Sequence, residues 1–251
     1  MLKNILIAVL GIALIVVLAF IFYSPSEQGA IGVTIKTISE KDNFFDIKAE
    51  YPQFKNADES FNQKISDLIK DNIEEFKKAG QDNWQARKDT ATDEFPVGEY
   101  PEIPFDFITT WKPDQINEKY ISLYISIYSF SGGAHGDQAT YSFNYDVGNK
   151  KEITIQDVLK SQEMLNKVSE LAKTNLEYQY QEKGIMVDES INQMIAEGIS
   201  AKYDNFKTFT FNANSMTFYF QKYQVGPGAA GEFSFVLYNS MLGEEKIGYM
   251  E

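Results

Sequence analysis

The 251-residue sequence contains no cysteine and only one histidine, His135. The absence of cysteine excludes disulfides, thiol nucleophiles, cysteine-ligated zinc and lipid attachment through a cysteine. A single histidine leaves oxygen atoms as the main metal ligands, and no stretch has the spacing of a calcium loop. We therefore expect no metal and no cofactor. Stability must come from the hydrophobic core, for which 43% hydrophobic residues are sufficient.

Basic residues are in deficit, because 23 Lys and Arg face 36 Asp and Glu and give a formal net charge of −13. Phosphate backbones would be repelled, so nucleic acid is not an expected partner. The glycine-rich stretch at 225–231 also lacks the Gly-Lys-Ser/Thr ending of a phosphate-binding loop. The excess of acid either attracts a cationic protein or polymer, or only keeps the protein soluble.

One stretch lacks charge altogether. Residues 5–23 read ILIAVLGIALIVVLAFIFY, an apolar run that as a helix of ~1.5 Å per residue spans roughly the ~30 Å core of a bilayer. Its end is a poor match to a signal-peptide cleavage site, which favours an uncleaved anchor over residues 1–24. Lys3 precedes the run, so we expect a single-pass cell-membrane protein with its C-terminal domain extracytoplasmic.

Aromatic residues are abundant, with 15 Tyr and 19 Phe, and this composition favours sheets. Alternating patterns predict a first α+β module over 25–148, in which apolar residues at helical spacing predict a helix that begins near Asp58 and ends at Gly80. A second α+β module is predicted over 149–251. The predicted fold is an N-terminal transmembrane helix followed by two modules of antiparallel sheets packed with amphipathic helices. The predicted strands are 31–35, 45–51, 105–111, 120–130, 140–147, 208–211, 216–220 and 232–238, and the further helices are 162–183 and 188–201.

The stretch from Gln81 to Pro104 has no clear periodicity and combines acidic, aromatic and proline residues. Prolines stiffen a segment, while exposed acids and rings supply charge and contact area, as a recognition loop requires. An ordinary long connection is the alternative. The candidate ligand-binding residues of this loop are Asp93, Glu94, Phe95, Glu99, Tyr100 and Glu102.

His135 is the other candidate ligand contact, and it lies in a glycine-rich turn between two aromatic-rich strands. Ser129, Ser131 and Asp137 are near it in sequence, as a catalytic set would require. However, neighbours on one hairpin are seldom arranged for proton relay, and the glycines are explained by a tight turn. No spacing singles out a carboxylate pair for glycoside hydrolysis. We therefore expect a binding module and no catalytic residues; a hydrolase using carboxylates or His135, or a scaffold protein, are the alternatives.

Three stretches of the sequence resemble a known pair of families. They are ISLYISIYSFSGGAHG at 121–136, YSFNYDVGNKKEITIQDVL at 141–159 and MTFYFQKYQVGPGAAGEFSFVLY at 216–238. Together they are similar to the paired extracytoplasmic modules called DUF4163 and DUF3298. Their markers are the turn at 132–136, the strand end at 144–146, the entry into the second module at 154–159 and the loop at 223–231.

This resemblance implies work at the bacterial cell envelope, because the pair occurs in a lysozyme-sensing anti-sigma factor and in a peptidoglycan deacetylase. Lysozyme-like cationic protein and peptidoglycan are the implied partners, and the acidic composition suits the first. We expect neither a sigma-binding segment before the anchor nor a deacetylase domain after Glu251, so neither of those activities is carried over.

Overall fold

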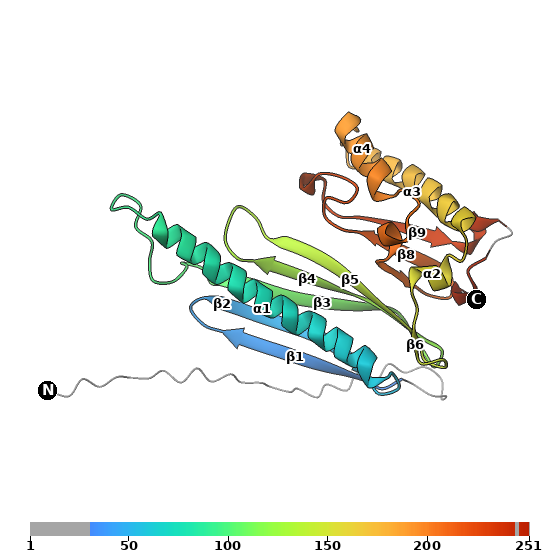
Figure 1. The fold of residues 1–251 in the computed structure, drawn as a ribbon, viewed down its shortest axis with the longest axis horizontal. Coiled ribbons are helices and arrows are strands. Elements are labelled where there is room, and N and C mark those ends of the chain that lie inside the picture. The colour runs from blue at the N-terminus through green and yellow to red at the C-terminus, as the bar shows by residue number, and fades with distance from the viewer. Residues whose placement is uncertain (1–30, 244–245, 251) are drawn as a thin grey trace.

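The computed structural model describes residues 31–243 and 246–250. The apolar run at 5–23, and with it the predicted membrane anchor, lies outside the described residues. Within them, no helix is both long and apolar enough to cross a bilayer. The described chain forms two β-sheets, each packed with helices, which confirms the α+β class (Figure 1).

The first sheet has six strands that neighbour one another in chain order. They are β1 (Val33–Lys41), β2 (Phe45–Phe54), β3 (Phe105–Ile116), β4 (Tyr120–Phe130), β5 (Asp137–Asp146) and β6 (Lys151–Glu152). The sequence predicts antiparallel sheets, but β2 and β3 pair in parallel. A parallel pair needs a crossover connection, and α1 (Glu59–Asp89) supplies it across one face of the sheet (Figure 1).

The length of α1 differs from the prediction. The helix runs through Gly80 for 31 residues in all, and Trp84 continues its buried stripe. A Cβ at Gly80 would lie 2.8 Å from the ring of Phe105 and 3.0 Å from that of Phe45. Gly80 therefore lets the helix approach the sheet closely and does not end it, so the loop that precedes β3 covers only residues 90–104.

The second sheet contains β7 (Phe209–Phe211), β8 (Ser215–Phe220) and β9 (Phe233–Tyr238), all antiparallel. The helices of this part are α2 (Ile155–Val158), α3 (Gln162–Glu182) and α4 (Glu189–Gly198). Buried residues of α3, from Leu165 to Tyr180, join those of the sheet in one hydrophobic cluster. A separate cluster fills the space between α1 and the first sheet.

The two sheets meet where β7 crosses the face of the first sheet opposite α1. Ser122 Oγ accepts a hydrogen bond from the N–H of Phe211 (2.8 Å), and Ser142 Oγ accepts one from the N–H of Phe209 (3.0 Å). Asn144 Nδ2 donates to the carbonyl of Phe209 (2.7 Å), while its Oδ1 accepts from the Ser122 hydroxyl (2.6 Å). Side chains of the first sheet thus take the place of a neighbouring strand for β7.

A second set of contacts joins the sheets farther along β5. Gln221 Nε2 donates to the carbonyl of Thr140 (2.6 Å), and Lys222 forms an ion pair with Asp137 (2.8 Å). The side chain of Gln221 bonds both backbone groups of Thr140, at a part of the β5 edge that β6 does not reach.

Asp157 makes the second module sensitive to acid. Its carboxylate pairs with Lys151 (2.6 Å) and caps α2 through Thr154, and these contacts lower the pKa of Asp157 from 3.8 to about 2. Because the folded-state pKa lies below the unfolded value, the stabilisation is complete above about pH 4 and is lost as pH falls through about 2. We expect Asp157→Asn to lower the free energy of unfolding by about 1–2 kcal/mol at neutral pH.

The difference between the original protein and Asp157→Asn should shrink as pH is lowered through this window, measured by urea unfolding at a series of pH values. Asp204→Asn, at an exposed position, is the control and should show a small difference that does not change with pH. A difference for Asp157→Asn that is constant from pH 7 to pH 2 would contradict the prediction.

Candidate functional site

Three connections of the first module meet at one end of its sheet (Figure 1). Asp46 of β2 is level with Asp106 of β3, and Asp106 is level with Phe130 at the end of β4. The turn at 42–44, the loop at 90–104 and the turn at 131–136 therefore emerge side by side. We call these three segments the distal surface, since they lie at the end of the sheet away from the start of β1.

The loop at 90–104 is held by residues on both sides of it. The ring of Tyr100 packs edge-to-face on Phe44, with centroids 5.4 Å apart, and the N–H of Phe105 donates to the carbonyl of Phe44 (2.7 Å). Trp84 Nε1 donates to the carbonyl of Glu99 (3.1 Å). The loop is consequently anchored at its C-terminal half against α1 and the turn before β2.

All six predicted residues of this loop are exposed. Phe95 has 72% of its surface exposed and Tyr100 has 41%; Ile103, which is not among the predicted residues, is exposed to 72%. The carboxylates of Asp93, Glu94, Glu99 and Glu102 take part in no ion pair among residues 31–243 and 246–250. The loop thus presents unpaired negative charge beside accessible apolar surface.

The negative charge of the distal surface acts on its tyrosine. The neighbouring carboxylate of Glu99 raises the pKa of the Tyr100 hydroxyl, and Asp42 of the adjacent turn adds to the effect. Asp42 itself accepts hydrogen bonds from the N–H groups of Phe44 and Phe45, each 2.7 Å long. Glu99 of the loop at 90–104 and Asp42 of the turn at 42–44 therefore both contribute to the negative electrostatic potential at Tyr100.

His135 is also exposed at the distal surface, but the described residues supply no catalytic arrangement around it. Its Nδ1 lies 2.9 Å from the carbonyl of Gly136, the next residue. Asp137 pairs with Lys222, and Ser131 contacts Asn83 of α1. No hydrogen bond in the described chain links His135 to a serine or a carboxylate, so the local geometry is that of a turn residue open to solvent.

The structure explains why glycine occupies three positions of this turn. Gly132 and Gly133 have φ angles of 93° and 111°, which side-chain-bearing residues rarely adopt. At Gly136 a Cβ would lie 2.4 Å from the Tyr128 ring, so glycine allows this ring to cover the backbone. The glycines therefore set the shape of the turn at 131–136, and the imidazole of His135 is its exposed functional side chain.

The other glycine-rich marker, at 223–231, lies beside the distal surface because Lys222 pairs with Asp137. Tyr223 adopts a φ of 66° and leaves 58% of its surface exposed. Behind it, Gly226 sits directly against Tyr180, whose hydroxyl donates to the carbonyl of Val225 (2.9 Å). The loop is therefore fixed from inside by α3, as the fold of the second module requires.

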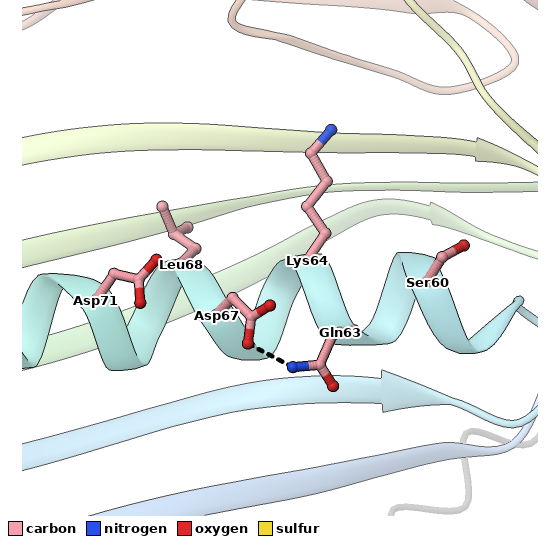
Figure 2. Close-up of a pocket in the computed structure, with 6 residues that line it drawn as sticks. All are labelled: Ser60, Gln63, Lys64, Asp67, Leu68 and Asp71. Carbon is pink, nitrogen blue, oxygen red and sulfur yellow. Dashed lines mark hydrogen bonds between the residues drawn. The ribbon is translucent and has the colours of Figure 1, made fainter.

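A hollow of about 500 Å³ lies elsewhere, on the solvent side of α1 (Figure 2). All of its lining residues belong to α1, and Figure 2 shows Gln63 bonded to Asp67 along the helix. Lys64 pairs with Glu152 of β6. Because one helix face supplies the whole lining, and Gln63, Lys64 and Asp67 already have partners, we do not take this hollow as the functional site. Its lining residues are Ser60, Gln63, Lys64, Asp67, Leu68 and Asp71.

In the described chain no three acidic or histidine side chains converge as metal ligands would. The contributions of Asp42, Phe44 and Trp84 to the distal surface were missed from the sequence. The position of Trp84 could have been predicted from the sequence, because it lies four residues after Gly80 and eight after Phe76 and so continues the apolar stripe of the helix. For Asp42 and Phe44 there was no such pattern, because their contact with Tyr100 depends on the parallel pairing of β2 and β3.

The fold defines a two-module α+β protein whose distal surface exposes acidic and aromatic side chains. Residues 38–138 match the family described as Deacetylase PdaC, and residues 156–239 match the family described as Protein of unknown function (DUF3298). The chain therefore carries a PdaC-type module followed by a DUF3298 module. This confirms the expected module pair, with the PdaC description in the place where DUF4163 was expected.

A curated relative is the peptidoglycan-N-acetylmuramic acid deacetylase PdaC of Bacillus subtilis (strain 168), which is 26% identical over 220 residues. The match covers 87% of this chain but only 42% of the deacetylase, so the chain spans less than half of that relative. The relationship indicates a cell-wall-associated function.

Two solved DUF3298-family structures share the fold. The one from Bacteroides fragilis has a TM-score of 0.58 and 16% identity, and the one from Pseudomonas aeruginosa PAO1 has a TM-score of 0.50 and 12% identity. Each comparison covers 88% of this chain and 94% of the other.

Proposed function

We propose that this protein is a membrane-anchored binding module of the cell envelope that captures a lysozyme-like cationic protein through its distal surface. The observation that carries the proposal is the loop at 90–104, where four unpaired carboxylates surround the exposed Phe95 and Tyr100. Aromatic residues supply contact area at protein interfaces, and complementary charge accelerates and orients encounter. The net charge of −13 adds a long-range attraction for a basic partner.

The direction of β1 suits an anchored receptor. Residue 33 begins β1 at one end of the sheet, and the distal surface lies at the other end (Figure 1). An anchor at residues 5–23 would therefore hold the protein in the cell membrane by the end opposite the distal surface. The loop at 90–104 would face outward, where an extracellular protein can reach it.

The direct test is binding by a soluble fragment of residues 25–251, which contains both hydrophobic clusters. We expect saturable binding to lysozyme by calorimetry, with an affinity that falls as salt is raised from about 50 to 500 mM because part of it is screened charge. Absence of saturable binding at low salt would remove lysozyme as the ligand.

Neutralising the loop should weaken this binding. For the triple variant Glu94→Gln, Glu99→Gln, Glu102→Gln we expect an affinity for lysozyme about tenfold lower at low salt, together with a smaller salt dependence, since exposed charge pairs contribute up to about 1 kcal/mol each. The free energy of unfolding should be nearly unchanged because all three side chains are exposed.

A matched control removes the same charge from the outer side of α1. The triple variant Asp71→Asn, Glu74→Gln, Glu75→Gln alters exposed carboxylates outside the distal surface. Its affinity should fall by less than about twofold. Equal losses in the two triple variants would mean that net charge, and not the loop, attracts the ligand.

Peptidoglycan is the second candidate ligand, favoured by the name of the relative that acts on it. Exposed rings such as Phe95, Tyr100 and Tyr223 could stack on sugars. Sedimentation of the same fragment with purified sacculi tests this candidate, and turnover of the sacculi would instead support the alternative of a hydrolase. In that case His135→Ala should abolish turnover without changing stability. If the fragment binds neither ligand, a scaffold role is the remaining reading.

A further inference from the structure

We propose that a hollow between the two modules binds a short zwitterionic peptide, a function separate from the distal surface. The hollow has a volume of about 280 Å³. Tyr120 begins β4 and Asp146 ends β5, so it lies at the end of the first sheet opposite the distal surface. Its other walls come from α2, the start of α3 and the C-terminal segment around Tyr249 (Figure 1).

The walls are fixed before any ligand arrives. The rings of Tyr120 and Tyr249 pack edge-to-face with centroids 5.5 Å apart, and Phe211 of β7 lies 5.6 Å from each of them. The C-terminal segment is held by Asn239, whose Oδ1 accepts from the N–H of Ile247 (3.0 Å). A preformed site loses little conformational entropy on binding, which favours even a small ligand.

Two carboxylates give the hollow fixed negative charge. Asp157 is held by Lys151 and Thr154, which keep its pKa at about 2. Asp146 accepts hydrogen bonds from the backbone and side chain of Asn149, both 2.9 Å long. These contacts orient the carboxylates. Both oxygens of Asp146 and Oδ1 of Asp157 accept one hydrogen bond each and keep capacity for a further donor, whereas Oδ2 of Asp157 already accepts two from Thr154.

Two lysines balance this charge. Lys160 and Lys246 also line the hollow and are exposed. Within residues 31–243 and 246–250 neither lysine belongs to an ion pair, although Lys151 beside them does. The lining thus carries charges of both signs, two carboxylates and two ammonium groups, which suits a ligand that itself carries both.

The tyrosine hydroxyls of the hollow add directional groups. The hydroxyls of Tyr145, Tyr180 and Tyr203 all have protein partners. By contrast, no hydrogen bond in the described part of the chain involves the hydroxyl of Tyr120 or Tyr249. Each is therefore free to donate to a ligand carboxylate or accept from an amide or ammonium group.

A short peptide with free ends matches this set of groups. Its ammonium group would face the carboxylates, its carboxylate would meet the lysines, and its aliphatic part would lie against the rings and the apolar floor. The volume suits two or three residues, and the buried Val158 and half-buried Met164 in the lining supply the apolar contact. A free amino acid has the same two charged groups at closer spacing. The comparison of alanine with trialanine in the test below distinguishes it from a short peptide.

The test follows methionine methyl NMR signals of the 25–251 fragment during titration. Met164 lines the hollow, whereas Met186, 86% exposed and outside the lining, is the internal reference. With trialanine we expect a saturable shift at Met164 only, with a Kd in the millimolar range (~−4 kcal/mol). N-acetyl-trialanine, trialanine amide and alanine should each bind about three- to fivefold more weakly, since each loses or misplaces a charge contact.

Two substitutions locate the ligand without disturbing the walls. Tyr249→Phe keeps the ring packing, and Lys246→Gln changes an exposed side chain. Each should weaken trialanine binding about threefold or more, whereas Lys70→Gln on α1 should leave it unchanged. Three results would overturn the proposal. They are absence of saturation at Met164, binding of the blocked peptides as tight as that of trialanine, and unchanged trialanine affinity in Tyr249→Phe and Lys246→Gln. Tighter binding of alanine would assign the hollow to free amino acids.

Discussion

Replacing Asn144 by alanine is expected to lower the free energy of unfolding by about 3–5 kcal/mol, the largest effect of a single polar side chain in this protein. Asn144 is only 6% exposed and links Ser122 of β4 to the carbonyl of Phe209 in β7. Without its amide, a buried carbonyl loses its partner and the Ser122 hydroxyl loses its acceptor. The cost is therefore the desolvation of two groups and not only two lost hydrogen bonds.

The substitution should also separate the unfolding of the two modules. Both tryptophans, Trp84 and Trp111, belong to the first hydrophobic cluster or pack against it, so their fluorescence follows that module alone. Circular dichroism follows both modules because α3 belongs to the second cluster. In urea we expect the two signals to coincide for the original protein and to diverge for Asn144→Ala.

Gln138→Ala is the control on the same strand, since Gln138 is exposed and bonds only to the Ser126 hydroxyl. It should change stability by less than about 0.5 kcal/mol and leave the two signals coincident. A loss below about 1 kcal/mol for Asn144→Ala would show that β7 is not held by this contact.

Gly226→Ala should be nearly as damaging, with an expected loss of about 3 kcal/mol. A Cβ at this position would lie 1.7 Å from the hydroxyl of Tyr180 and 3.0 Å from its ring carbon. Tyr180 cannot move aside easily because it is fully buried and stacks on Phe233 at 4.7 Å. The loop at 223–231 must therefore shift, and urea unfolding measures the cost.

A double substitution identifies the cause. Tyr180→Phe alone should cost about 1 kcal/mol through the lost hydrogen bond to Val225, but it also removes the clashing oxygen. Gly226→Ala should then cost less in the Tyr180→Phe protein than in the original one. Gly248→Ala, where a Cβ would meet nothing within 4 Å, should be nearly neutral. Additive losses in the double variant would rule out the clash as the cause.

Much of the fold could be predicted because its signals are local. Alternating residues located β4 at its observed bounds, and the apolar stripe from Phe61 to Phe76 located most of α1. The end of α1 could not be predicted, since Gly80 is a helix terminator by local preference and a packing residue only in the presence of Phe105. The parallel pairing of β2 with β3 likewise depends on where a 31-residue helix returns the chain.

For the candidate site, too, local features could be predicted from the sequence and tertiary contacts could not. Exposure of the loop at 90–104 followed from its acids and prolines, whereas its attachment to Phe44 required tertiary contacts. Ser122 and Asn144 had the pattern of a polar, solvent-facing side of a sheet. Their burial arises only because β7, more than 60 residues later in the chain, crosses that side, as the hydrogen bonds to Phe209 and Phe211 show.

The position of β1 has a mechanical consequence. β1 is the edge strand at which the described chain begins, and nine residue pairs from Val33–Phe54 to Lys41–Asp46 join it to β2. A force that draws residue 31 away from the distal surface acts along the axis of β1 and strains all of these pairs together, in shear. Pulling across the strand would instead open them one at a time, like a zipper. If the protein is tethered at its N-terminal end and binds a large ligand at the distal surface, the tension between the two would load β1 in shear. Shear is the direction in which the pairing of β1 with β2 resists force most strongly.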